Sequence, residues 1–598
     1  MWKLLRFLKD YKKESILGPL FKMLEASFEL LVPLVIASLI DIGIANRDTA
    51  YIMKMCGILV LLAVIGLTCS ITAQYYAAKA AVGFAAKMRH ALFAHIQQLS
   101  FTEIDEVGTD TMITRMTSDS NQVQTGVNQV LRLFLRSPFI VFGAMIMAFT
   151  VDVKAAVIFV ITIPLLSVVV FGIMLISIPL FRKVQQSLEN VLGITRENLT
   201  GSRVIRAFNR EEAEITRFEE NNEILTKLQL YVGRLSGLMG PLTFIIVNAA
   251  LIALIWTGAW QVETGVITQG EVVALINYMS QILVELVKLA NLIITVTKAI
   301  ACGNRIQTLF ELETSMQGGD FTGREKEQYR ALEEDAADYE ESMAEVEYAV
   351  EFRKVSMRYK DAGADTLNDI DFGVKRGETV GIIGGTGSGK TSVVNLIPRF
   401  YDVSEGEVLV DGVNVKEYTL ELLREKIGVV PQKSVLFAGT IRSNLLWGNA
   451  LATEEEMEEA LARAQAKEVV DKKKGRLDAQ VEQGGRNFSG GQKQRLAIAR
   501  ALVKRPKILI LDDSASALDY ATDARLRQAI RKMPSNPTVF IVSQRAASIM
   551  HADKIVVLDD GEIAGIGTHE ELLSACKVYQ EIYYSQFRKE TGAGGGAG

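Results

Sequence analysis

Three long stretches without a charged side chain place the strongest constraint on how this chain folds. They are residues 55–78, 155–181 and 235–262 of 598. A helix needs about 20 mostly apolar residues to cross the hydrocarbon core of a bilayer, because each residue advances the helix by about 1.5 Å. All three stretches exceed that length, so each is predicted to be a membrane-spanning helix. Charged residues still make up 23% of the chain, which predicts soluble protein in addition to the spans.

Three shorter apolar stretches raise the predicted number of spans to six. They are residues 30–40, 137–151 and 272–297, the last interrupted by Glu285 and Lys288. Connections after the first, third and fifth spans are short, whereas the alternate connections are long and rich in Lys and Arg. By the positive-inside rule, the long connections and both termini are cytoplasmic. No proline occurs between Pro33 and Pro138, so the second span is predicted to continue to about residue 100 as one helix roughly 70 Å long, which projects from the membrane as a stalk.

Charged residues occur at two places in the predicted spans, and each place has two possible roles. Glu285 and Lys288 are three positions apart and share a helix face, so they are predicted to form an ion pair with a functional role in the membrane. Alternatively, this part of the sixth span faces water or a partner. Asp41 is predicted to mark the outer end of the first span, although a role in a gate or in substrate binding is an alternative.

Composition excludes several other classes of protein. The net charge of −5 and the pI near 5.8 argue against a nucleic-acid partner, which would require a basic domain or stripe. The four cysteines are scattered, which predicts free thiols.

The first residues, MWKLLRFLKDYKK, alternate apolar and basic side chains and predict an amphipathic helix on the surface of the lipid bilayer.

The chain is predicted to contain a membrane half and a soluble half. Residues 1–312 form an all-α transmembrane domain with long cytoplasmic helical extensions, and the acidic segment 313–347 is a charged linker. From residue 348 to 585, strand-like runs alternate with helical patterns, which predicts an α/β domain with a largely parallel sheet. Residues 586–598, ending in GAGGGAG, are predicted to be a flexible tail.

One glycine-rich segment of the soluble half predicts a nucleotide site. TVGIIGGTGSGKTSVVNLI gives an apolar strand, a glycine-rich turn and the start of a helix, and it contains the pattern G-x-x-x-x-G-K-[ST]. In such P-loops backbone N–H groups surround phosphates, the Lys reaches the β and γ phosphates, and the Thr hydroxyl binds Mg²⁺. Asp512, at the end of the strand ILIL, supplies the expected carboxylate on the Mg²⁺ side. The predicted nucleotide-binding residues here are Gly384, Gly385, Thr386, Gly387, Ser388, Gly389, Lys390, Thr391 and Ser392.

A second glycine-rich segment lies in the same half. NFSGGQKQRLAIARAL places Ser489, Gly490 and Gly491 before a helix that begins near Gln492. This arrangement predicts either a second anion-binding helix terminus or simply a glycine-rich helix cap.

Together these motifs resemble those of an ABC exporter half-transporter, with six spans followed by one P-loop nucleotide-binding domain. The resemblance covers residues 1–585. It implies that Tyr359 stacks on adenine and that Gln432, in VVPQKSVLF, is the Q-loop residue beside Mg²⁺ and the catalytic centre. It also implies that FSGGQ is the signature that caps ATP held by another subunit, and that SALD, ending at Asp519, is the D-loop. ENLTGSRVIRAFNREEAE resembles the second cytoplasmic loop, which couples the two halves.

Two positions depart from the pattern of hydrolytic members of this family. Those members have Glu after the Asp on the Mg²⁺ side, where this chain has Asp513, and a switch His where this chain has Gln544. Asp is one methylene shorter, and a displacement of about 1 Å can cost on the order of 100-fold in rate. Gln cannot become a cation or exchange a proton as imidazole does. Both changes are predicted to weaken hydrolysis while preserving the binding of ATP and Mg²⁺.

A degenerate ATP site beside an intact signature resembles one subunit of the heterodimeric bacterial multidrug-type exporters. The resemblance implies a second, non-identical half-transporter that supplies the catalytic Glu and His. It also implies ATP-driven export of amphipathic small molecules across the plasma membrane by alternating access. A homodimeric exporter with slow hydrolysis, an ATP-gated channel or regulatory membrane ATPase, and an importer on the same fold are the alternatives.

Overall fold

The computed structural model describes residues 1–321, 347–360, 362–514 and 518–587. These residues form two compact units. Unit 1 contains residues 1–98 and 108–313, and unit 2 contains residues 99–107 together with the chain from Thr314 onward. The division differs from the predicted one at two places, because the segment 99–107 and residues 314–321 both belong to the soluble unit. Most of the predicted acidic linker, and the tail beyond Phe587, lie outside the described residues.

Six helices of the described chain are long and apolar enough to cross a membrane, as predicted. Some are formed by consecutive shorter elements. Their bounds are Lys3–Ile44, Thr49–Gln98, Thr109–Val151, Val153–Thr200, Glu211–Glu263 and Gln269–Phe310. The second of these is the single 50-residue helix α2 (Thr49–Gln98), which spans about 75 Å at the standard rise. The predicted uninterrupted stalk is therefore confirmed.

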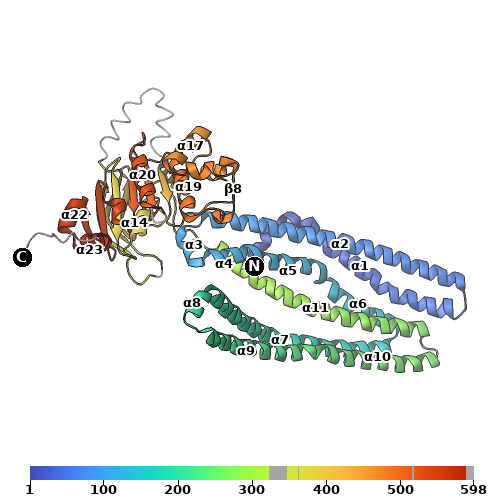
Figure 1. Cartoon of the computed structure of the whole chain (residues 1–598). Coiled ribbons are helices and arrows are strands. Elements are labelled where there is room, and N and C mark those ends of the chain that lie inside the picture. Colours follow the sequence, from blue (N-terminus) through green and yellow to red (C-terminus); the bar gives the residue numbers. More distant parts are fainter. Residues whose placement is uncertain (322–346, 361, 515–517, 588–598) are drawn as a thin grey trace, which may run out of the picture. The chain divides into compact units, whose positions relative to one another are not determined.

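Small residues explain how the first two long helices approach each other. Helix α1 (Lys12–Ser38) packs against α2 (Figure 1), and the buried face of α2 is rich in alanine, including Ala73, Ala77 and Ala80. A Cβ atom on Gly18 would lie 3.3 Å from the backbone nitrogen of Ala77. Close backbone approach through small residues is the usual means by which helices associate in a membrane.

The remaining helices of unit 1 complete the bundle. Helices α7 and α9 pack side by side, and α11 packs against α1, α5, α6, α7 and α10 (Figure 1). The bounds of these elements are α4 (Thr109–Thr114), η3 (Arg115–Asp119), α5 (Ser120–Leu133), α6 (Arg136–Val151), α7 (Val153–Thr200), α8 (Ser202–Ala207), α9 (Glu211–Gly237), α10 (Met239–Glu263) and α11 (Gln269–Phe310).

The N-terminal segment is the 3-10 helix η1 (Trp2–Tyr11), and it contacts other parts of unit 1. Leu4 is buried, and Lys3 forms an ion pair with Glu311 at 2.6 Å. The terminal ammonium of Met1 donates a hydrogen bond to Asn304 Oδ1 at 2.9 Å. This segment is therefore anchored to the end of α11 by protein contacts.

Asp41 caps a helix. It lies in the π-helical turn η2 (Leu39–Ile44), where its carboxylate accepts hydrogen bonds from the Thr268 hydroxyl at 2.5 Å and from the Gly270 backbone N–H at 2.7 Å. Thr268 is the N-cap residue of α11. A carboxylate at a helix N-terminus satisfies unpaired N–H groups and interacts favourably with the helix dipole. Its contacts support the interpretation that Asp41 ends the first span.

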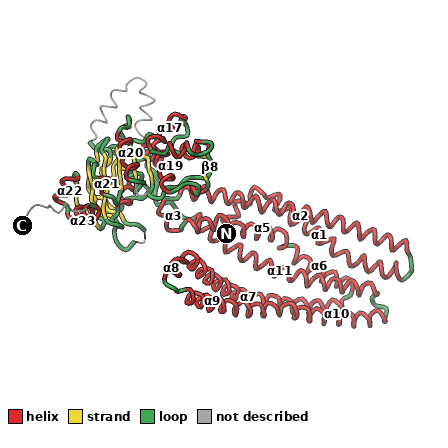
Figure 2. Tube along the Cα trace, viewed as in Figure 1, coloured by secondary structure: helices red, strands yellow, loops and turns green. Residues whose placement is uncertain are grey.

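The described strands all lie in unit 2 (Figure 2), where they form two main sheets and one short pair. The larger has the strand order β12-β11-β3-β10-β9-β6, in which every neighbouring pair is parallel except β11 and β12. The smaller is antiparallel, with the order β2-β1-β4-β5. The predicted α/β domain with a largely parallel sheet is confirmed. The strands are β1 (Val350–Met357), β2 (Leu367–Val374), β3 (Thr379–Gly384), β4 (Glu405–Val410), β5 (Val413–Asn414), β6 (Ile427–Val430), β7 (Gly439–Thr440), β8 (Gln480–Val481), β9 (Ile508–Asp512), β10 (Thr538–Val542), β11 (Lys554–Asp559) and β12 (Glu562–Gly567).

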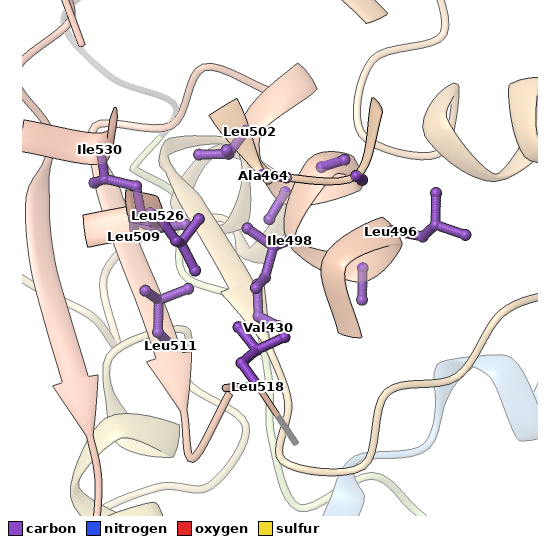
Figure 3. Close-up of a cluster of buried hydrophobic side chains, with 14 of the residues drawn as sticks. Val430, Ala464, Leu496, Ile498, Leu502, Leu509, Leu511, Leu518, Leu526 and Ile530 are labelled. Carbon is purple, nitrogen blue, oxygen red and sulfur yellow. The ribbon is translucent and has the colours of Figure 1, made fainter. Parts of the chain in front are cut away.

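The larger sheet and the helices packed against it share one hydrophobic core. Strand β9 is buried along its whole length, and its Leu509 and Leu511 contact a cluster that includes Ile498 and Leu526 from neighbouring helices (Figure 3). This packing fixes the end of β9, where Asp512 lies. The helices of unit 2 are α3 (Phe101–Val107), α14 (Lys390–Leu396), α15 (Leu420–Lys426), α16 (Ile441–Leu445), α17 (Glu454–Arg463), α18 (Lys467–Asp471), η4 (Arg476–Asp478), η5 (Gln483–Gly485), α19 (Gly490–Val503), α20 (Tyr520–Arg531), α21 (Ala546–Ile549), α22 (His569–Ala575) and α23 (Lys577–Gln586).

Candidate nucleotide site

The glycine-rich turn connects β3 to α14, and crowding at one position and backbone conformation at another explain two of its glycines. A Cβ atom on Gly384 would lie 2.1 Å from the carbonyl oxygen of Leu558, so no other residue fits there without a shift of the backbone. Gly389 has φ of 89°, a conformation that side chains other than glycine rarely adopt. The turn then leads directly into α14, whose first residue is Lys390.

Lys390 points back over the turn that precedes it. Its ammonium donates hydrogen bonds to the carbonyl oxygen of Gly384 at 3.1 Å and to that of Gly385. Burial lowers the pKa of Lys390, and the nearby carboxylates of Asp513 and Asp512 oppose this effect. The ammonium of Lys390 is therefore paired with neutral backbone carbonyls. An anion at this place would form a stronger, charge-assisted hydrogen bond with it.

Asp512 lies at the end of β9, beside the P-loop threonine. The Thr391 hydroxyl donates to Asp512 Oδ1 at 3.0 Å, although the two residues are 121 positions apart. Asp512 is only 5% exposed, and burial raises the pKa of its carboxyl above the usual range. A hydroxyl oxygen and a carboxylate side by side are ligands that Mg²⁺ prefers.

The two residues that depart from the hydrolytic pattern lie in the same pocket. A cavity of about 300 Å³ is lined by Lys390, Thr391, Gln432, Asp512, Asp513 and Gln544, among others. Gln432 Nε2 donates to Asp513 Oδ2 at 3.3 Å. Asp513 has φ of 44°, in the left-handed region that Asp tolerates better than most residues. The structure thus brings together the predicted P-loop, Q-loop, Mg²⁺-side and switch positions.

Tyr359 is next to this pocket and contacts the P-loop helix. Its hydroxyl lies 3.0 Å from Ser392 Oγ, and its ring meets the ring of Tyr401 edge-on at 5.1 Å. Tyr401 in turn donates a hydrogen bond to Asp105 of α3 at 2.6 Å. Tyr359, Tyr401 and Asp105 line a second cavity of about 540 Å³. The sequence did not predict Tyr401 or α3 as neighbours of Tyr359.

The signature segment lies apart from the pocket. Ser489 and Gln492 form a capping box at the start of α19, in which Gln492 N–H donates to Ser489 Oγ and Ser489 N–H donates to Gln492 Oε1. Ser489 and Gly490 are exposed. None of the four described residues from Ser489 to Gln492 lines the 300 Å³ cavity. Asp519 is the N-cap residue of α20, and the three residues before Leu518 in the predicted D-loop region lie outside the described chain.

Unit 1 contains a buried cluster of charges within its spans. Glu285, only 2% exposed, accepts hydrogen bonds from Arg136 at 2.6 Å, Ser137 at 2.8 Å and Lys288 at 2.8 Å. Arg136 also donates to Glu29 at 2.7 Å. The predicted pair of Glu285 and Lys288 exists, but the sequence did not predict Arg136 as its principal buried partner. Glu29, Glu285 and Lys288 line a cavity of about 300 Å³ together with Asn277, Ser280 and Gln281.

Comparison with known proteins identifies both halves. Residues 15–286 match the model of the ABC transporter transmembrane region, and residues 367–516 match the ABC transporter model. An uncharacterized ABC transporter ATP-binding protein of Mycobacterium tuberculosis is 34% identical over 592 residues, covering 98% of each chain. A putative multidrug export ATP-binding/permease protein of Bacillus subtilis is 32% identical over 98% of this chain and 99% of its own.

A solved structure shares the fold. The bacterial Atm1-family ABC exporter with ATP bound superposes with a TM-score of 0.76 at 21% identity, covering 97% of this chain and 100% of its own. The two family matches and the relatives aligned over nearly the whole chain assign both the helical unit and the P-loop unit to one family. The chain belongs to the ABC transporters and is a half-transporter with one transmembrane domain and one nucleotide-binding domain.

Proposed function

We propose that this chain is the subunit that carries the degenerate site of a heterodimeric ABC exporter. The observation that carries the proposal is the pocket in which Lys390, Thr391 and Asp512 are complete while Asp513 and Gln544 occupy the positions of a catalytic Glu and a switch His. ATP and Mg²⁺ fit the residues present, because the site offers a buried cation and two adjacent oxygen ligands. Bound Mg²⁺ neutralises charge on the phosphates.

Each residue has a role in this proposal. Lys390 and the backbone of residues 384–389 hold the phosphates, Thr391 and Asp512 hold Mg²⁺ with Gln432 beside them, and Tyr359 stacks on the adenine. Asp513 orients water poorly because its carboxylate is one methylene short and accepts a hydrogen bond from Gln432. Gln544 accepts and donates hydrogen bonds but exchanges no proton. ATP therefore stays bound at this site, because its cleavage there is slow.

A second, non-identical half-transporter would complete two composite sites. The exposed N-terminus of α19, from Ser489 to Gln492, is available to cap ATP on the partner, and the partner supplies the Glu and His that this chain lacks. Two exposed apolar pairs support association with another chain. Val204 and Phe208 are exposed on and beside α8, and Phe437 stacks on Trp447 at 4.3 Å on the surface of unit 2.

The membrane cavity supports an amphipathic substrate. Its walls combine Val32, Pro33 and Ile36 with the carboxylate of Glu29 and the ammonium of Lys288. Both of these charged side chains are about two-fifths exposed. Apolar walls with a few charged groups fit molecules that have an apolar body and a polar end. In this proposal ATP binding closes the nucleotide-binding domains, the helices turn the cavity outward, and hydrolysis at the partner's site resets them.

The first experiment compares two substitutions in the ATPase activity of the purified chain, alone and assembled with the product of an adjacent half-transporter gene. If the proposal is right, only the assembly hydrolyses ATP. Asp513→Ala then has a mild effect, and Ser489→Ala abolishes most activity because Ser489 belongs to the competent composite site. A chain that hydrolyses ATP alone and loses activity with either substitution is instead a homodimeric ATPase.

Transport is tested separately in inside-out plasma-membrane vesicles, where the nucleotide-binding domains face the bath. An exporter accumulates a fluorescent amphipathic cation in the vesicle lumen against its gradient when ATP is added. ATP-dependent depletion of preloaded dye would indicate an importer. Equilibration in both directions, without accumulation, would indicate a channel.

A further inference from the structure

The last helix of the described chain contacts the loop that carries Gln544. This switch loop, residues 543–545, connects β10 to α21. Gln586, the final residue of α23, donates from Nε2 to the carbonyl oxygen of Gln544 at 2.7 Å. Its Oε1 accepts from the backbone N–H of Ala546 at 2.9 Å. One planar amide therefore holds the main chain on both sides of Arg545.

Helix α23 is held in place by packed side chains. Tyr579 is fully buried, and its hydroxyl lies 2.7 Å from Nδ1 of His569 on α22. Ile582 and Tyr583 pack against the core of the larger sheet. Gln580 donates to the carbonyl oxygen of Leu573 on α22 at 2.9 Å. Gln586 thus extends from a packed element although it lies near the C-terminus.

The switch loop has a second set of contacts, made by Arg545. The Arg545 N–H donates to Ser543 Oγ at 2.9 Å, and the Arg545 guanidinium donates to the carbonyl oxygen of Leu518 at 3.2 Å, next to Asp519. The Gln544 side chain lines the nucleotide pocket, whereas its carbonyl faces Gln586. Gln586 therefore contacts the main chain of Gln544, while the Gln544 side chain lines the pocket.

We propose that Gln586 is a positioning residue for Gln544. By fixing the peptide groups around Gln544, it restricts the positions that the Gln544 side chain can take toward bound nucleotide, in the way that supporting hydrogen bonds orient groups in other sites. Helix α23 thereby controls how long nucleotide stays at this chain's own site. The inference rests on the proposed nucleotide site, but it holds whether that site retains ATP or cleaves it.

The test measures dissociation of the fluorescent analogue mant-ATP, with Mg²⁺, from the full chain. Gln586→Ala should speed dissociation by about three- to tenfold, the effect of losing one or two ordinary hydrogen bonds. Gln586→Glu should be intermediate, because a carboxylate accepts from Ala546 but cannot donate to Gln544. Ser585→Ala is the matched control, because it removes an exposed hydrogen bond from the neighbouring residue of α23, from Ser585 Oγ to the carbonyl oxygen of Ile582 at 2.7 Å, and should leave the rate unchanged.

Two further measurements separate positioning from loss of structure. Hydrogen exchange at the Ala546 amide should accelerate in Gln586→Ala while the melting temperature stays the same. In a Gln544→Ala background, Gln586→Ala should add little to the dissociation rate, because its effect passes through Gln544. Additive effects, or an equal effect of Ser585→Ala, would overturn the proposal.

The nucleotide site itself is checked with Lys390→Ala. If this variant still binds mant-ATP normally, the proposed nucleotide site is wrong. If it abolishes binding while Gln586→Ala changes nothing, only the inference about Gln586 fails.

Discussion

Asp512 shows how the nucleotide site reduces the stability of the chain that carries it. Its carboxyl is buried with one hydrogen bond from Thr391, and burial raises its pKa. A buried carboxylate without a full set of partners costs free energy until a cation arrives. Binding sites commonly gain stability when such a group is replaced, at the expense of function.

We therefore expect Asp512→Asn to stabilise the nucleotide-free protein. Asn keeps an acceptor for Thr391 without the charge, so the gain should be on the order of 1 kcal/mol, or about 2–4 °C in Tm. The pKa of Asp512 is higher in the folded than in the unfolded chain. Its ionisation therefore lowers the free energy of unfolding by the full amount above the folded pKa, and this loss disappears as the pH falls to the pKa of the unfolded chain. Differential scanning fluorimetry from pH 7 to pH 4 should show the advantage of Asn shrinking with acid. The same variant should lose the extra stabilisation that Mg²⁺ adds to ATP.

At the scale of elements, α3 is tied to the nucleotide-binding unit by a small set of contacts. Phe101 meets Phe400 at 4.8 Å, Tyr401 donates to Asp105, and Lys360 pairs with Glu106 at 2.5 Å. Tyr401 also touches Tyr359, the residue proposed to stack on adenine. If Tyr359 stacks on adenine as proposed, Tyr401 connects the adenine site to α3 by direct contacts.

Tyr401→Phe should loosen α3 while keeping the ring contact with Tyr359. Loss of the hydrogen bond to Asp105 is expected to cost about 1 kcal/mol, which would speed amide exchange in residues 99–107 about fivefold. Tyr418→Phe is the control, because Tyr418 donates a comparable bond to the carbonyl of Val410 at 2.9 Å. Equal acceleration in both variants, or none in Tyr401→Phe, would show that this bond does not hold α3.

The charge cluster of the membrane unit allows a second prediction at this scale. Glu285→Gln removes the charge of the carboxylate at 2.6 Å from the buried Arg136, while Glu29 stays hydrogen-bonded to it, and should destabilise the detergent-solubilised chain by about 3 kcal/mol. Lys288→Met should cost less than about 1 kcal/mol, since its side chain is 43% exposed. The double variant, with Arg136→Gln and Glu285→Gln, should be destabilised by less than the sum of the two single variants, as measured by thermal unfolding. A larger loss in Lys288→Met than in Glu285→Gln would contradict this order.

These elements also show what the sequence could predict. Hydropathy and strand patterns predicted the six long helices and the parallel sheet, because each signal lies within one segment. The meeting of Thr391 and Asp512 was predictable as well, since both follow parallel strands of one sheet. The bond between Tyr401 and Asp105 joins residues 296 positions apart and that between Arg136 and Glu285 joins residues 149 apart. Such contacts depend on packing and leave no periodic pattern.

At the scale of the whole molecule, the proposal makes the two ATP sites of an assembled transporter unequal. In the proposal, Lys390, Thr391 and Asp512 bind Mg·ATP, while Asp513 and Gln544 stand in place of the Glu and His on which fast cleavage depends. A site that binds without cleaving keeps its nucleotide through several cycles of the other site. Association of the nucleotide-binding domains then persists between turnovers, because one ATP still bridges them.

We therefore expect the assembly, after steady turnover and rapid removal of free nucleotide, to retain about one intact ATP per heterodimer. Radiolabelled ATP and separation of retained ATP from ADP measure this directly. Lys390→Ala in this chain should abolish retention, because the buried ammonium is the principal cation at the phosphates. The corresponding Lys variant of the partner should stop hydrolysis yet leave retention intact. The contrary outcome is that both sites retain equal amounts of ADP and that either Lys variant abolishes retention. The two sites would then turn over alike, and Asp513 would be a working catalytic residue.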